Sequence, residues 1–187
     1  MGSDFRFVDL FCGVGGFRLA LEDLSGECVF SSEIDTAARQ TYARNFGDAL
    51  GGDITKIDAS SIPEFDLLAA GFPCQPFSYA GKLEGSHDKV RGTLFFDVLR
   101  IIGHHKPKMF ILENVKGLKS HNQGSTMQTI IDQLEHAGYT VHWSILDSLD
   151  FELPQQRQRW YCVGFREPRS FAFPSASKNK SILRDLS

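Results

Sequence analysis

The sequence is poor in cysteine and carries almost no excess of charge. Its four cysteines, among 187 residues, lie far apart and form no CxxC pair. This spacing argues against a zinc site and fits a reduced cytoplasm, so we expect a cytoplasmic protein without a bound metal. The formal net charge of −3 gives no global signature of nucleic-acid binding. Any contact with nucleic acid must therefore come from a local patch or from another polypeptide.

Long apolar runs and repeats are also missing. No stretch approaches the roughly twenty apolar residues of a membrane span, and no signal-sequence pattern opens the chain. Hydrophobic residues make up 42% of the chain and aromatic residues 12%, which is enough to bury one sizeable core. We therefore expect a single domain over 1–187 and no membrane association.

Strand and helix patterns alternate along the chain. Short apolar runs predict about seven strands, at 6–11, 28–32, 52–54, 65–70, 109–112, 140–146 and 160–165. Helical spacing occurs between them, at 17–24, 36–46, 93–103 and 126–137. Such alternation is typical of parallel βαβ units, so we predict an α/β fold with a mostly parallel sheet and helices on both faces.

The first strand is followed by a glycine-rich turn. Gly13, Gly15 and Gly16 allow the backbone to approach a ligand closely, and the helix start offers free amide groups. Glu33 lies twenty residues beyond Gly13, where a carboxylate can accept hydrogen bonds from ribose hydroxyls. The pattern predicts a nucleoside-containing cofactor, although it does not separate a dinucleotide from S-adenosylmethionine. The alternative is that the glycines only form a tight turn.

Cys74 lies in the segment GFPCQPFS, directly after the strand pattern at 65–70. Pro73 and Pro76 stiffen the backbone on both sides of this thiol, at the strand end where open parallel sheets bind their ligands. A free cysteine is most often a small buried hydrophobe. The long polar, glycine-rich segment 78–92 that follows favours a functional loop, and hence a nucleophilic Cys74.

Three charged residues complete the set of candidates. Glu113 closes the apolar run at 109–112, where partial burial would raise the pKa of its carboxyl group. The alternative for Glu113 is a capping or salt-bridging role. Arg157 and Arg159 would project from the same face of an extended segment. Exposed arginines in an anonymous loop are usually only solvated.

Taken together, four segments resemble the cytosine carbon-5 DNA methyltransferases, in particular the bacterial modification enzymes of the HhaI type. These segments are FVDLFCGVGGF at 7–17, PCQ at 73–75, ENV at 113–115 and QRQR at 156–159, and they occur in the order and at the spacing of the family. The resemblance runs from about Arg6 to the C-terminus. It implies the Rossmann-like fold of S-adenosylmethionine-dependent methyltransferases and a bacterial, cytoplasmic enzyme of a restriction-modification system.

The resemblance also implies a cofactor site for S-adenosylmethionine. Phe11 and the pair Asp53 and Ile54 would contact the adenine, and Glu33 would hold the ribose. Glycines of the first turn would border the methionine portion, and Pro73 and Leu94 would lie near the reactive end. The full set implied is Phe11, Gly13, Val14, Gly16, Glu33, Ile34, Asp53, Ile54, Pro73 and Leu94.

For the reaction, the resemblance implies DNA (cytosine-5-)-methyltransferase activity on a flipped-out base in duplex DNA. Cys74 would attack carbon-6 of the cytosine, and Glu113 would grip the ring nitrogen. Arg159 would polarise the carbonyl, and Arg157 would support the loop or the DNA backbone. Segment 78–92 would close on the base, with Ser78, Lys82 and Arg91 as DNA contacts.

One departure from the family concerns its later part. We find a cofactor-binding half at about 1–70 and a catalytic half at about 71–170, but no target-recognition region. The chain resembles the catalytic subunit of a split enzyme, which would need a second polypeptide carrying the recognition region and a closing helix. The alternative is a truncated chain. In either case we expect the isolated chain to be inactive or weakly active.

Two other functions stay open. One is a non-catalytic scaffold that binds S-adenosylmethionine or DNA, which would not need Cys74, Glu113 and Arg159 together. The other is cytosine-5 methylation of tRNA, because related tRNA-modifying proteins carry the same PCQ and ENV elements. The recognised DNA sequence would depend on the recognition region, so none is assigned.

Overall fold

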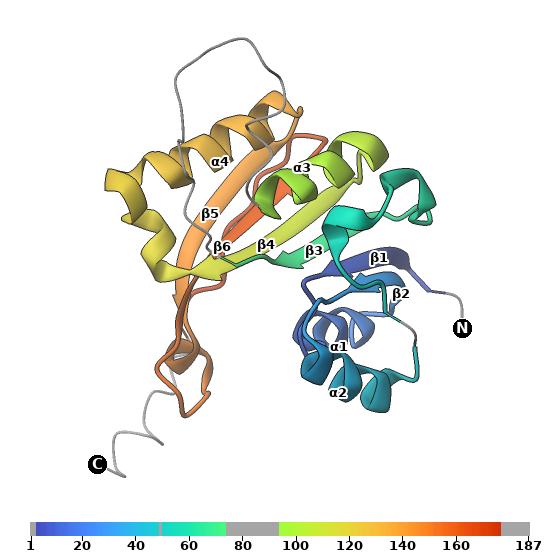
Figure 1. The fold of residues 1–187 in the computed structure, drawn as a ribbon. Helices are drawn as coiled ribbons and strands as arrows, with labels where there is room; N and C mark the ends of the chain where they lie inside the picture. The colour runs from blue at the N-terminus through green and yellow to red at the C-terminus, as the bar shows by residue number, and fades with distance from the viewer. Residues whose placement is uncertain (1–2, 49, 74–93, 177–187) are drawn as a thin grey trace.

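The computed structural model describes residues 3–48, 50–73 and 94–176, and its centre is one six-stranded sheet. The strand order is β2-β1-β3-β4-β6-β5 (Figure 1). The pairs β1/β2, β1/β3 and β3/β4 are parallel, whereas β6 is antiparallel to both β4 and β5. The strands are β1 (Phe5–Leu10), β2 (Gly26–Ser32), β3 (Leu67–Gly71), β4 (Met109–Val115), β5 (Thr140–Asp147) and β6 (Gln158–Phe165).

Helices cover both faces of the sheet, as predicted. The α-helices are α1 (Gly16–Glu22), α2 (Thr36–Phe46), α3 (Leu94–His105) and α4 (Ser125–His136). Alternate residues of β1 enter two separate hydrophobic clusters: Val8 and Leu10 pack with α3 and α4, and Phe7 packs with Leu21 of α1. Figure 1 accordingly shows α3 and α4 on one side of the sheet and α1 and α2 on the other.

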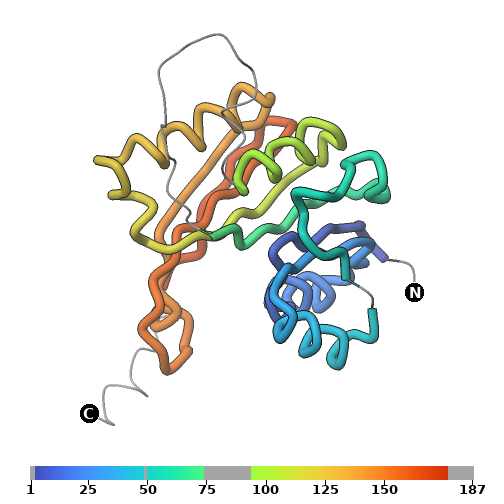
Figure 2. Tube along the Cα trace, in the orientation of Figure 1, coloured from blue at the N-terminus to red at the C-terminus, as the bar shows by residue number. Residues whose placement is uncertain are grey.

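Short 3₁₀ segments form several of the connections. They are η1 (Ile54–Lys56), η2 (Ala59–Ser61), η3 (Lys116–Lys119), η4 (His121–Gly124) and η5 (Ser148–Phe151). The connection that contains η5 projects beyond the sheet between β5 and β6 (Figure 2). Within the described part of the chain, no helix is long and apolar enough to cross a membrane.

The prediction that 52–54 ends a strand is wrong, and the sheet formed by the described residues has six strands rather than about seven. Gly51 forms only an isolated bridge with Ser32. The next residues turn because the Asp53 side chain accepts hydrogen bonds from the backbone and hydroxyl of Thr55, at 3.1 and 2.7 Å, and caps η1. A local side-chain bond therefore replaces strand pairing here.

The predicted end of the strand before Glu113 is also wrong. β4 continues to Val115, because Glu113, Asn114 and Val115 pair with Tyr161, Trp160 and Arg159 of β6. This longer pairing places Glu113 within the sheet, opposite Tyr161 and two residues before Val115, the partner of Arg159.

Candidate active site

A pocket of about 250 Å³ lies where the parallel strands β1, β2 and β3 end. The carboxyl ends of parallel strands form the usual ligand-binding edge of an open α/β sheet. The lining residues come from the ends of these strands, from the residues before and within η1, and from the start of α3: Phe11, Ser32, Glu33, Ile34, Gly52, Asp53, Ile54, Gly71, Pro73 and Leu94.

The turn after β1 forms one wall of this pocket. Phe11 and Gly13 have φ angles of 55° and 54°, in the left-handed region that a residue such as Phe rarely adopts. Strained backbone of this kind is concentrated at ligand-binding sites. The Gly13 amide donates a hydrogen bond to Glu33 Oε2 at 2.9 Å, which ties the turn to the end of β2.

Glu33 is held at the pocket wall from two sides. Besides the bond from Gly13, its Oε1 atom accepts a hydrogen bond from the Asp35 amide at 2.9 Å. The Glu33 amide in turn donates to the Gly51 carbonyl oxygen at 3.1 Å. The carboxylate is therefore oriented before any ligand arrives, and it links the glycine turn to the segment that leads into η1.

Asp53 and Ile54 lie on the opposite part of the lining. The hydrogen bonds from Thr55 hold the pKa of the Asp53 carboxyl below its usual value, with a smaller contribution from Lys56. Ile54 is buried, at 3% exposure, and belongs to the main hydrophobic cluster. The pair thus offers an apolar side chain next to a carboxylate. This combination suits an aromatic ring of a ligand that carries hydrogen-bonding groups on its edge.

Seven of the ten residues predicted to bind the cofactor line the pocket: Phe11, Glu33, Ile34, Asp53, Ile54, Pro73 and Leu94. Gly13 reaches it through Glu33, whereas Val14 is 55% exposed and Gly16 begins α1. Sequence reasoning missed Ser32, Gly52 and Gly71 as lining residues. Ser32 directly precedes Glu33 in the chain, and Gly52 directly precedes Asp53. These positions next to predicted site residues could have identified both as lining residues.

Glu113 and Arg159 form an ion pair beside this pocket. Arg159 Nε lies 2.9 Å from Glu113 Oε1, and both side chains are about one-fifth exposed, at 21% and 22%. Burial raises the pKa of the Glu113 carboxyl, and the charges of Arg159 and Arg157 oppose this rise. Glu113 therefore retains a proton to a higher pH than a free glutamate, as a group that donates a proton must.

Gly71 connects the ion pair to the pocket. It lines the pocket, pairs in register with Glu113, and has its missing side-chain position 3.4 Å from Glu113 Oε2. The carboxyl group and the predicted cofactor wall are thus adjacent across a single strand end.

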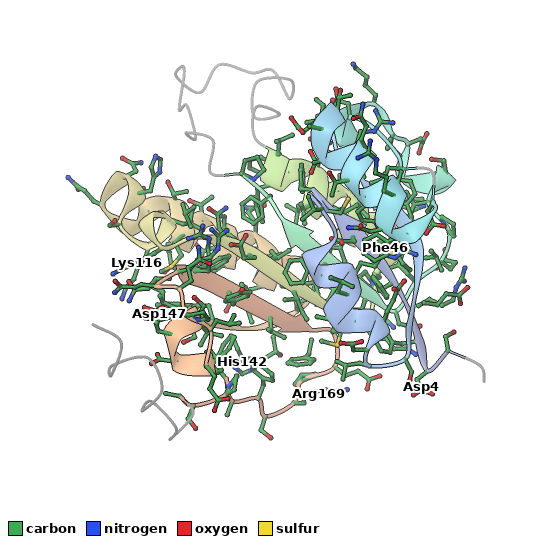
Figure 3. All side chains as sticks on the ribbon, turned by 90° about the horizontal axis from the view of Figure 1, so that it is seen from below. Asp4, Phe46, Lys116, His142, Asp147 and Arg169 are labelled. Carbon is green, nitrogen blue, oxygen red and sulfur yellow. The ribbon has the colours of Figure 1, made fainter. Side chains whose placement is uncertain are left out.

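Arg157 is exposed and precedes β6. Its amide donates to Asp147 Oδ1 at 3.1 Å, and its carbonyl accepts from the Ser148 amide at 3.2 Å. Lys116 donates to the neighbouring Gln158 Oε1 at 2.6 Å. Figure 3 shows Lys116 and Asp147 close together on one side of the molecule, at the end of the sheet that carries the Glu113–Arg159 pair.

Asn114 is a site residue to which sequence reasoning gave no role of its own. Its side chain is buried, Nδ2 donates to the Phe72 carbonyl at 2.9 Å, and Oδ1 accepts from the Val115 amide at 2.8 Å. Asn114 therefore fixes the backbone two residues before Cys74. Its position inside the ENV motif was the only signal for it.

The predicted nucleophile and DNA contacts, Cys74, Ser78, Lys82 and Arg91, lie outside the described residues. Among the residues that the structure describes, no group of three or more His, Cys, Asp and Glu side chains could hold a metal ion.

The strand-end pocket and the carboxyl–guanidinium pair beside it lie at the edge where open α/β sheets bind their ligands. The family model for C-5 cytosine-specific DNA methylases matches residues 5–187, and the chain belongs to that family.

Individual relatives agree with this assignment. The chain is 50% identical to the type II methyltransferase M.MspI of Moraxella sp, over 98% of this chain and 44% of that protein. It is 45% identical to M.HhaI of Haemophilus parahaemolyticus, over 98% of this chain and 57% of that protein. The chain thus spans about half the length of the curated relatives that it matches.

Solved structures share the fold. A mutant of DNMT2 from Spodoptera frugiperda superposes with a TM-score of 0.71 at 25% identity, covering 91% of this chain and 52% of that one. A putative DNA modification methyltransferase from an Escherichia coli prophage gives 0.70 at 24% identity, over 87% and 47% of the two chains.

Proposed function

We propose that this chain supplies the catalytic part of a DNA (cytosine-5-)-methyltransferase. The observation that carries the proposal is the adjacency across Gly71 of the strand-end pocket and the Glu113–Arg159 pair. In a chain of this family, that adjacency provides a cofactor site and a proton donor within one active centre. The activity, substrate and partners of the whole protein are proposals, because the chain spans about half the length of its relatives.

We propose that S-adenosylmethionine binds in this pocket, as the family of the chain indicates. The Glu33 carboxylate is positioned to accept hydrogen bonds from ribose hydroxyls, and Phe11 and Ile54 offer apolar surface for the adenine. Pro73 and Leu94, which directly flank residues 74–93 in the sequence, also line the pocket. Bound there, the cofactor supplies an electrophilic methyl group.

The residues of the chain activate the cytosine. The Cys74 thiolate adds to carbon-6, and the electron pair of the 5,6 double bond shifts through carbon-4 towards the ring nitrogen. Glu113 gives a proton to the ring nitrogen while Arg159 polarises the carbonyl, so that the negative charge does not accumulate. Once carbon-5 has gained the methyl group, its proton passes to a water molecule, the sulfur–carbon bond breaks to release the Cys74 thiolate, and Glu113 recovers its proton from the ring nitrogen.

A second polypeptide or segment would complete the enzyme. An apolar groove of about 380 Å³ lies on the α1 side of the sheet, between α1 and strands β1, β3, β4 and β6. It is lined by Phe5, Leu21, Leu24, Asp66, Leu67, Lys108, Met109, Ile111, Phe165 and Arg169. Exposed apolar surface of this kind marks interaction sites. We propose that it receives the closing helix of the recognition part.

Methyl transfer from labelled S-adenosylmethionine tests the function. The chain would be assayed alone and with any small protein encoded beside its gene, on mixed-sequence duplex DNA and on structured RNA. We expect transfer to DNA only when the second polypeptide is present, and none with Cys74→Ala. Transfer to RNA alone would favour a tRNA-type enzyme. Cofactor binding without transfer in any mixture would favour a scaffold.

A further inference from the structure

Arg18 is a buried cation in the helix that follows the glycine turn. Its side chain is only 10% exposed, and its Nε atom lies 2.7 Å from Glu22 Oε1 within α1. Nη1 donates to the Tyr42 hydroxyl of α2 at 3.1 Å and also forms an ion pair with Asp48. The guanidinium carbon lies 4.4 Å from the centre of the Phe46 ring. One side chain thus joins α1, α2 and the residues that follow α2.

The same aromatic residues of α2 press against the glycine turn. A side chain built on Gly15 would lie 2.3 Å from the Phe46 ring and 3.3 Å from Tyr42, and Gly15 has a φ angle of 98°. The turn is therefore packed directly on the rings that Arg18 holds. Figure 3 labels Phe46 on α2, next to α1.

A buried guanidinium is a costly way to obtain stability alone. Replacing a buried ion pair by well-packed apolar side chains is often neutral or stabilising, because charges lose hydration on burial. The planar guanidinium also fixes the orientation of the groups that it contacts, because the angles between its hydrogen-bond donors are fixed. Such contacts matter for α1, because a helix of seven residues is too short to be stable without packing against other elements.

The residues that Arg18 contacts connect, through their neighbours in the chain, to both walls of the pocket. On one side the bond from Arg18 to Tyr42 ties α1 to α2, against which the turn packs at Gly15. The same turn contains Gly13, which is bonded to Glu33. On the other side Arg18 holds Asp48, three residues before Gly51, whose carbonyl accepts the Glu33 amide and whose amide donates to Ser31. Gly51 leads directly to the lining residues Gly52 and Asp53.

We propose that Arg18 is a positioning residue for the cofactor, which sets the spacing between the glycine turn and the Asp53 wall of the pocket. This inference rests on the proposed cofactor function of that pocket. It concerns a residue that would not touch the cofactor itself.

Binding of S-adenosylhomocysteine to the full chain, measured by calorimetry, tests the proposal. Arg18→Met keeps much of the length of the side chain but removes the guanidinium, and we expect the Kd to rise about tenfold or more. Arg18→Lys keeps the charge without the planar donors, so an intermediate Kd is expected. The control is Tyr139→Phe, which removes the buried hydrogen bond to the Pro107 carbonyl at the opposite edge of the sheet. It should lower the melting temperature and leave the Kd unchanged.

Amide hydrogen exchange provides a readout that does not depend on the cofactor. In Arg18→Lys, the amides of Gly13, Gly15 and Gly16 should exchange faster, while those of β3 and β4 keep their protection. Uniform loss of protection would indicate a merely structural role and overturn the proposal. So would an unchanged Kd in a folded Arg18 variant, or an equal loss of affinity in Tyr139→Phe. If the wild-type chain binds neither S-adenosylhomocysteine nor S-adenosylmethionine, the cofactor function fails first, and the positioning role with it.

Discussion

At the scale of single residues, Glu113 is the group whose surroundings fit a chemical role best. Desolvation raises its pKa while Arg159, 2.9 Å away, keeps the charged form accessible. Opposing influences of this kind keep a carboxyl group able both to donate and to accept a proton.

Replacing Glu113 with Gln should separate proton transfer from binding. The amide keeps the shape of the side chain but has no acidic proton, so methyl transfer by the complete enzyme should fall by about 10²-fold or more. The Kd for S-adenosylhomocysteine should stay within about twofold, since Glu113 does not line the pocket. A variant with normal transfer would remove Glu113 from the mechanism.

Asp9 is a second buried carboxyl group, and it affects stability rather than chemistry. It is fully buried in β1, and burial raises its pKa to about 7, against opposing contributions from Arg18. The folded state therefore keeps a proton that the unfolded state releases near pH 4. The stabilisation is complete below that pH and is lost as the pH rises towards 7.

The variant Asp9→Asn should remove this pH dependence. Its free energy of unfolding, relative to the wild type, should increase between about pH 4 and pH 7 by a few kcal/mol and stay constant above that range. Urea unfolding at several pH values measures the difference. A difference that does not change with pH would show that Asp9 has an ordinary pKa.

At the scale of secondary structure, the antiparallel pairing of β4 with β6 shapes the site. It extends β4 through Asn114, whose buried amide reaches across to the Phe72 carbonyl after β3. The end of one strand thus holds the chain that leads to Cys74. Backbone pairing and one side-chain bond together determine where that segment starts.

Asn114→Ala should test this arrangement. It leaves the buried Phe72 carbonyl without its donor, which should cost about 1–3 kcal/mol of stability. Because the segment before Cys74 loses its anchor, methyl transfer should fall by more than the loss of folded protein explains. The comparison is Tyr139→Phe, which loses a buried hydrogen bond far from the site. Equal specific activities of the two folded variants would contradict the assigned role.

The sequence allowed the elements to be predicted, but not all of their ends or pairings. Apolar runs at 65–70 and 160–165 locate β3 and β6, because burial requires apolar side chains in any arrangement. The end of β4 was wrong, because its last residues are polar and are held in the sheet only by β6, over forty residues away. Residues 52–54 were misread because the Asp53–Thr55 bond, a local polar contact, outweighs their strand pattern.

In the candidate site, too, local sequence signals could be interpreted, whereas contacts that form only in the folded chain could not be predicted. Residues within the motifs could be predicted, since their spacing is local, and most of the predicted cofactor residues line one pocket. Arg18 could not be assigned, because its role depends on Tyr42, Phe46 and Asp48, which come near it only in the folded chain. The groove beside α1 likewise combines four separate strands with α1.

At the scale of the whole molecule, that groove predicts where the proposed second polypeptide would bind. Leu24 lines the groove and is 67% exposed, so Leu24→Glu should be tolerated by the fold yet place a charge in the interface. We expect binding of the second polypeptide to weaken about tenfold or more. Leu19→Glu is the matched control, because Leu19 is 59% exposed in α1 but does not line the groove. Equal effects of both variants would place the interface elsewhere.

The most direct test of the account is to trap the covalent complex. In duplex DNA that carries 5-fluorocytosine, carbon-5 has no proton to lose after methylation, so the sulfur–carbon bond should persist. With S-adenosylmethionine and the second polypeptide present, mass spectrometry should find the DNA attached to Cys74, and Cys74→Ala should give no adduct. Methylation of normal DNA without any adduct, or an adduct at another residue, would contradict the proposed mechanism.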